Sequence, residues 1–199
     1  GNDSYRVVGI THGAVDSGGN PLVYLALPDA QKVQFEQDKR ALDAAAAARD
    51  AVQQHLKAAP SSLQGLLLSA QIDFRLGAYP QAEAVLLTIL KRLPQQPLAR
   101  TLLVQTYLRD GRPALALDAM KPMLQDDKLD SDRLALAGEV YMRNGDVEKA
   151  AVYFEKAAAL DPKSVGKKTA VAISHLAKGD GERGLEELEA AAAEDTGIR

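Results

Sequence analysis

The chain has 199 residues, a formal net charge of −3 at pH 7 and 46% hydrophobic residues, and it contains neither cysteine nor tryptophan. This length and hydrophobic content suffice for a sizeable core, while the small net charge and the lack of a long Lys/Arg cluster argue against nucleic acid as a partner. The absence of cysteine excludes disulfides, zinc–thiolate sites and cysteine nucleophiles. The sequence also contains no run of about 18 apolar residues, which is the pattern that predicts a membrane span.

Residues 1–28 do not follow the pattern of the rest of the chain. Two short β-prone runs, residues 5–10 and 22–27, flank a turn-rich stretch from His12 to Pro21. This arrangement predicts a β-hairpin or two short strands. Because a two-stranded hairpin is marginal by itself, we expect it to pack against a neighbouring element or another chain.

Residues 29–62 are predicted to be helical, either as a degenerate copy of the repeat described next or as one long helix. Ala48 and Pro60 are in register with the later repeats. Asp43, however, stands where those repeats have a turn glycine, and the alanines that follow it are strong helix formers. This favours one continuous helix from about 29 to 59.

The remainder of the chain has a period of 34 residues. Its clearest markers are glycines at this spacing: Gly77, Gly111, Gly145 and Gly179. Glycine is the residue that most easily adopts the positive φ with which many helices end. A period of 34 is typical of a helix–turn–helix unit that stacks into a solenoid. The sequence therefore predicts four repeats, at 63–96, 97–130, 131–164 and 165–198.

The third repeat resembles the tetratricopeptide repeat (TPR) family. Its small, aromatic, turn and stop residues fall at the family's positions: Ala137, Gly138, Tyr141, Gly145, Ala150, Phe154, Ala157 and Pro162. The other repeats are looser, with Val104 at a small-residue position, Asp73 and His175 at the aromatic position, Lys128 at the proline position and Gly184 at the alanine position. The resemblance implies an all-α fold, a right-handed TPR solenoid of antiparallel helix pairs, after the hairpin-like N-terminal segment.

The fourth repeat is expected to be the least stable, because glycine inside a helix costs about 1 kcal/mol relative to alanine. It also lacks a polar capping helix, so we expect its last helix to be mobile or to be covered by a second copy of the chain. Self-association through uncapped ends is thus one expected interaction, and the chain is predicted to be a piece of a longer array.

In the TPR family, the first helices of successive repeats line a concave groove that binds partners. Carried onto this chain, the groove positions form a basic, a polar and an apolar row: Arg75, Arg109 and Arg143; Gln71, Gln105 and Glu139; Phe74, Leu108 and Met142. Because guanidinium pairs well with carboxylate, the basic row predicts an extended peptide with acidic groups as the ligand. Two alternatives remain open: the arginines can simply complement helix dipoles, and the apolar row can be core between repeats.

No arrangement of residues predicts catalysis, a metal or a cofactor. His12 falls in the predicted turn, and His55 and His175 occupy helix-packing positions, where a histidine is usually a hydrogen-bonded core residue. Neither His55 nor His175 has a second metal-ligating residue at i+4 on its helix. The carboxylates of the last helix, Glu186, Glu187 and Glu189, are predicted to be a solvated face. The sequence therefore predicts a binding protein and not an enzyme.

A finer resemblance covers roughly residues 56–199. The run Arg-Asp-Gly-Arg-Pro-Ala-Leu-Ala-Leu at 109–117, the Lys-Pro-Met-Leu at 121–124 and the third repeat resemble the TPR lipoprotein that accompanies exosortase and PEP-CTERM sorting systems. That resemblance implies an exported, lipid-anchored scaffold in the periplasm, held at the outer membrane and encoded with exopolysaccharide genes. A cytosolic TPR adaptor, or a module like a co-chaperone, is the alternative.

Overall fold

The computed structural model describes residues 10–15, 21–23, 43–44, 46–125 and 129–195. The chain divides into two compact units, Gly1–Asp50 and Ala51–Arg199. Within the described residues, no helix combines the length and the apolar character that crossing a membrane requires.

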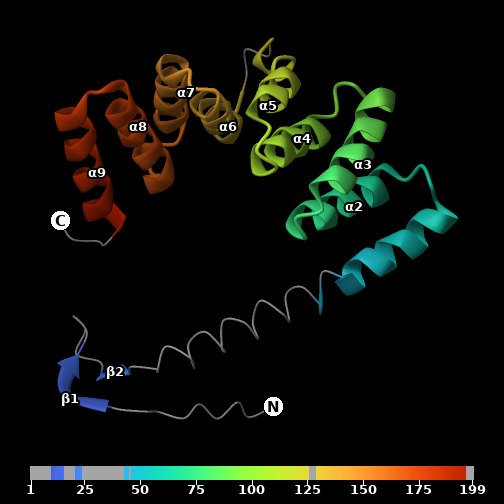
Figure 1. Cartoon of the computed structure of the whole chain (residues 1–199), viewed down its shortest axis with the longest axis horizontal. Helices are drawn as coiled ribbons and strands as arrows, with labels where there is room; N and C mark the ends of the chain where they lie inside the picture. Colours follow the sequence, from blue (N-terminus) through green and yellow to red (C-terminus); the bar gives the residue numbers. More distant parts are fainter. Residues whose placement is uncertain (1–9, 16–20, 24–42, 45, 126–128, 196–199) are drawn as a thin grey trace. The chain divides into compact units, whose positions relative to one another are not determined.

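The first unit contains a β-hairpin (Figure 1). Strand β1 (Ile10–Val15) pairs antiparallel with β2 (Pro21–Val23), and the register shifts between its two ends. The predicted hairpin is therefore present, but its first strand lies later in the chain than expected. His12 is part of β1 and not of a turn, because β1 extends from Ile10 to Val15, and residues 16–20 of the predicted turn lie outside the described residues. Residues 5–9 and 24–27 of the predicted strands lie outside the described residues.

The segment after the hairpin is helical where the structure describes it, at residues 43–44 and 46–58. Asp43 is thus helical and does not form the turn that a two-helix repeat would need. Residues 29–42 of the predicted long helix lie outside the described residues. In the second unit, Val52 of this helix is 7% exposed, and the His55 and Leu56 side chains lie against the backbone of Gly65.

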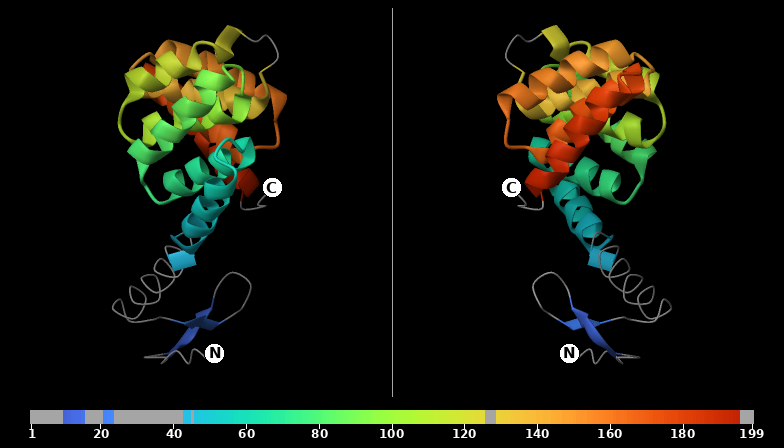
Figure 2. Two further views of the ribbon diagram at one scale, coloured as in Figure 1. Left: turned by 90° about the vertical axis from the view of Figure 1, so that its right-hand side faces the viewer. Right: turned by 90° about the vertical axis from the view of Figure 1, so that its left-hand side faces the viewer.

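Residues 63–195 fold into consecutive helix pairs that stack one after another (Figures 1 and 2). The helices are α2 (Leu63–Arg75), α3 (Tyr79–Arg92), α4 (Pro97–Arg109), α5 (Pro113–Met120), α6 (Ser131–Arg143), α7 (Val147–Leu160), α8 (Val165–Lys178) and α9 (Gly181–Asp195), with a 3₁₀ turn, η1 (Met123–Gln125), after α5. The predicted all-α TPR solenoid is confirmed.

Each pair turns at one of the periodic glycines, which have φ values of +71°, +72°, +81° and +92° in chain order. In the third repeat, the Gly145 N–H donates to the Met142 carbonyl at 3.1 Å and the Asp146 N–H to the Tyr141 carbonyl at 3.0 Å. The other three turns repeat this pattern, which is the Schellman motif. The glycines are therefore required locally, to satisfy the last carbonyls of each first helix.

Small residues let the paired helices approach closely. Ala70, Ala99 and Ala137 on first helices, and Ala82 and Ala150 on second helices, have no exposed surface. Longer apolar side chains such as Leu86 and Met120 fill the remaining space. A core without tryptophan is thus packed by alanine at the helix crossings and by leucine, isoleucine and methionine between them.

The second repeat departs from the others in its second helix, since α5 has 8 residues where α3 and α7 each have 14. Pro122 lies two residues after the end of α5. Proline offers no N–H to the preceding turn and its ring collides with a carbonyl one turn earlier, so the helix stops there and continues only as η1.

Candidate peptide-binding groove

The basic row lies at equivalent places in three repeats. Arg75, Arg109 and Arg143 are the last residues of α2, α4 and α6. All three side chains are exposed. None of them makes an ion pair or hydrogen bond within the residues that the structure describes. The row is therefore available to a ligand, and its position at helix C-termini also complements the helix dipoles.

The polar row is accessible in part. Gln71 and Glu139 are exposed, and Gln105 is half-buried. Glu139 precedes Arg143 by four residues on α6, the orientation in which a helical Glu–Arg pair attracts. An acidic ligand would therefore compete with Glu139 for Arg143. It would have no such competitor at Arg75 or Arg109, because the residue four positions earlier is an uncharged glutamine.

The apolar row belongs largely to the core. Leu108 is 9% exposed and is part of the main hydrophobic cluster. Phe74 packs against that cluster, with its ring centroid 6.0 Å from that of Tyr79. Met142 is half-buried. These positions agree with the alternative that the apolar row is core between repeats, and Leu108 offers little exposed surface to a ligand.

One hollow of about 400 Å³ opens among four helices of the last three repeats. It is lined by Gln105, Asp132, Ala135, Leu136, Glu139, Phe154 and Ala170. Gln105 and Glu139 both belong to the predicted polar row, so this hollow is a section of the predicted groove. The structure thus brings Gln105 and Glu139 together, from α4 and α6.

Two small residues create this hollow. Ala135 occupies the place that Leu67 occupies in the first repeat, so a shorter side chain leaves space there. Gly138 lets the Phe154 ring lie directly against α6, because a Cβ at this position would be 2.5 Å from Phe154 Cδ1. Ala135 thus leaves the hollow open, and Gly138 lets the Phe154 ring at its base lie close to α6.

The two acids of the hollow have different surroundings. Lys167 Nζ lies 2.7 Å from Asp132 Oδ1 and 2.8 Å from Asp161 Oδ2, and these hydrogen bonds raise the pKa of Lys167. Asp132 is therefore already paired. Glu139 makes no ion pair or hydrogen bond with any residue that the structure describes. The unpaired negative charge of the hollow is that of Glu139.

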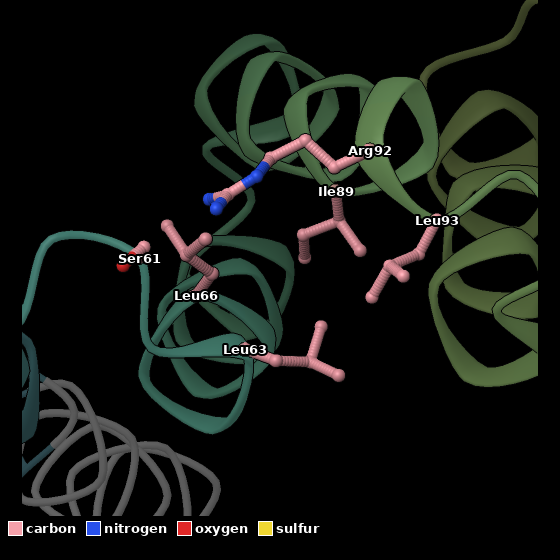
Figure 3. A pocket seen from close by; sticks show the side chains of 6 residues that line it. All are labelled: Ser61, Leu63, Leu66, Ile89, Arg92 and Leu93. Atoms are coloured by element: carbon pink, nitrogen blue, oxygen red, sulfur yellow. The ribbon is translucent and has the colours of Figure 1, made fainter.

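A second apolar pocket lies outside the predicted rows. It has a volume of about 280 Å³ and lies between the start of α2 and the end of α3. Figure 3 shows Leu63, Leu66, Ile89 and Leu93 around it, with Arg92 extending across from α3. Residues 61 and 89–93 are not groove positions of a TPR, so reasoning from the repeat pattern did not point to this pocket.

His175 forms a buried polar cluster among the last three helices. Its side chain is 2% exposed, with Nδ1 2.6 Å from Glu187 Oε2 on α9 and Nε2 3.1 Å from Glu155 Oε1 on α7. Arg183 Nε donates to Glu187 Oε1 at 3.0 Å. The prediction of a satisfied core histidine is confirmed at His175.

Two predictions at the surface were wrong. Glu187 is not part of a solvated face, because its carboxylate closes the cluster around His175, while Glu186 and Glu189 are exposed as predicted. His55 is exposed, although its ring lies against Gly65 and 3.3 Å from Ser62 Oγ. Because Gly65 has no side chain, it covers only part of the His55 ring, and the rest of the ring is exposed.

Comparison with known proteins agrees with this architecture. Two tetratricopeptide repeat family models match, one at residues 132–164 and the other at residues 37–97. No curated protein sequence matches the chain significantly.

Solved structures share the fold at low sequence identity. MamA 41-end from Desulfovibrio magneticus RS-1 is 20% identical, with a TM-score of 0.71 over 86% of this chain and 98% of that one. Another crystal structure of MamA is 18% identical, with a TM-score of 0.67 over 87% and 97%. A tetratricopeptide repeat protein from Parabacteroides merdae ATCC 43184 is 17% identical, with a TM-score of 0.56 over 63% and 49%. The family models mark tetratricopeptide repeats within residues 37–97 and 132–164, and the helix pairs with their periodic turns, like the solved structures, show the tetratricopeptide repeat fold.

Proposed function

We propose that this protein is a scaffold that acts by binding, and that its groove holds an extended segment of a partner protein. The observation that carries this proposal is the row of Arg75, Arg109 and Arg143, three exposed and unpaired guanidinium groups at one repeat position beside a partly apolar hollow. Regular stacking gives equivalent positions similar orientations, so the three charges face the ligand from one side.

The part of the ligand that meets the row is acidic. Carboxylates form charge-assisted, often bidentate hydrogen bonds with guanidinium. Glutamine neighbours at Gln71 and Gln105 add donors and acceptors without adding charge. The negative charge of Glu139, one turn before Arg143 on α6, weakens the third site without forming an ion pair, so Arg75 and Arg109 contribute most of the attraction.

The experiment replaces Arg75, Arg109 and Arg143 together by alanine. We expect binding of an acidic extended partner segment to weaken, and to weaken in the parent protein as salt screens the attraction. Stability should change by at most about 1 kcal/mol per residue, because exposed charges contribute little. A matched control replaces three exposed basic residues outside the groove, Lys57, Lys91 and Lys163, by alanine. Equal binding by the two triple variants would contradict the proposal.

We further propose a cellular setting from the resemblance of residues 56–199 to the TPR lipoprotein of PEP-CTERM and exosortase systems. In that setting, the intact protein is anchored by lipid in the periplasm, at the outer membrane, and supports protein sorting or exopolysaccharide export. Metabolic labelling of the intact protein with a radioactive fatty acid tests this, with an expected signal that disappears when the acceptor cysteine at the end of its lipoprotein signal is replaced. An unlabelled protein in the cytosolic fraction would instead favour the adaptor alternative.

A further inference from the structure

The hollow of the third repeat differs in chemistry from the arginine row beside it. Leu136 and Phe154 form an apolar floor, each 8% exposed, and Ala135 and Ala170 leave the space above it open. Its volume of about 400 Å³ lies near the lower end of the range of ligand pockets, about 300–1,000 Å³. These features suit an apolar side chain of a bound segment better than a charged one.

The charge at the rim of the hollow is opposite to that of the arginine row. Asp132 pairs at 2.7 Å with Lys167, which it shares with Asp161, whereas Glu139 has no partner among the described residues beyond the attraction of Arg143 one turn away. A carboxylate at the edge of an apolar site favours a cation in a ligand that covers it, because the covered site excludes water and strengthens the attraction.

We infer that this hollow is an anchor subsite of the groove, which takes an apolar side chain while Glu139 pairs with a lysine or arginine next to it in the same segment. The inference rests on the proposed groove function and makes it more specific. The ligand carries acidic groups opposite Arg75 and Arg109, but it carries an apolar residue with a basic neighbour at α6. The order of these groups fixes the direction in which the segment lies.

Two substitutions test the subsite. Ala135→Leu fills the hollow with the side chain that Leu67 provides at the same position of the first repeat, so the helix pair is expected to tolerate it. Glu139→Lys reverses the charge at the rim. The matched control, Ala159→Leu, adds the same side chain at an exposed position of α7. Circular dichroism and urea unfolding establish that each variant remains folded.

The probe is a phage-displayed library of random dodecapeptides, selected on the full chain. We expect enriched peptides to contain an apolar residue beside lysine or arginine, with acidic residues on one side of that pair. Binding of these peptides should fall about tenfold or more with Ala135→Leu, as expected for losing the burial of one apolar side chain, and stay unchanged with Ala159→Leu. Selection on Glu139→Lys should replace the basic neighbour by an acidic one.

The outcomes separate this inference from the proposed function. Peptides that lose affinity for the triple arginine variant but bind Ala135→Leu and Glu139→Lys as well as the parent would overturn the anchor subsite alone. Peptides that bind all variants equally, or a selection that enriches no sequence, would overturn the groove function and the subsite with it.

Discussion

At the scale of single residues, Gly145 shows how one backbone angle defines a repeat. Its φ is +81°, and a β-branched residue is a true outlier there. We expect Gly145→Val to lower the free energy of unfolding by about 1–3 kcal/mol, measured by urea denaturation. Gly166→Val is the control, because Gly166 has open space around its Cβ position and no positive φ. An equal effect of the two changes would show that strain at the turn is unimportant.

Gly184 has a different reason to be glycine. A Cβ there would lie 2.6 Å from Leu176 Cγ and 2.9 Å from the Ala172 carbonyl oxygen. The glycine that was expected to weaken the fourth repeat therefore allows α9 to approach α8 closely.

We expect Gly184→Ala to destabilise the protein by about 1–3 kcal/mol through overpacking, despite the higher helix propensity of alanine. Gly181→Ala in the same helix, which has open space around it, should be neutral or slightly stabilising. Thermal unfolding of the two variants measures the difference. A stabilised Gly184→Ala variant would mean that Leu176 and α8 can move enough to make room for the added methyl group.

At the scale of elements, Glu83 of α3 connects the first two repeats. It accepts a hydrogen bond from the Tyr107 hydroxyl of α4 at 2.9 Å and one from Arg112 Nη2 at 2.6 Å. The bond from Arg112 lowers the pKa of Glu83 more than burial raises it, while burial and the carboxylate raise the pKa of Tyr107 to about 12. The ionised form of Glu83 is therefore the one that stabilises the contact between α3 and α4.

A carboxyl group whose pKa is lower in the folded than in the unfolded state contributes stability above its unfolded pKa of about 4.3. This contribution is lost as the pH falls through the lower, folded-state pKa. We expect Glu83→Gln to reduce the free energy of unfolding by about 1–2 kcal/mol at pH 7 and by much less near pH 3. Urea titrations at both pH values measure this, with the exposed Glu189→Gln as the control. A loss that is the same at both pH values would contradict the ionised contact.

At the scale of the whole solenoid, α9 is a weakly covered helix. Leu185 is 57% exposed, and the described part of α9 buries two residues, Gly184 and Ala191, whereas α6 buries five. We expect amide hydrogen exchange to be faster in α9 than in α6 if the protein is monomeric. Self-association that covers α9 should slow this exchange, and Leu185→Glu should then restore it. Light scattering that shows a strict monomer, with slow exchange throughout 182–195, would contradict both expectations.

The positions of the helices were predictable from the sequence because the signals that end them are local. Gly77, Gly111, Gly145 and Gly179 each form the predicted turn, since a positive φ is a requirement of a single residue. Asp43 stands at the position of this turn glycine in the preceding 34 residues, and it is helical because no residue there favours a positive φ. The basic row was placed by carrying the groove positions of the TPR family onto the repeat, and its three arginines are exposed.

The tertiary structure decided everything that depends on which side chains from different helices meet. Leu108 is core because neighbouring repeats cover it, and Glu187 is paired because α8 places His175 opposite it. The hollow exists because Phe154 from α7 and Ala170 from α8 meet α6 at Ala135. The sequence by itself thus determined the repeat, its turns and the register of its rows, which are local properties. Burial, pairing and cavity shape were set only by the packing of side chains that are far apart in the chain.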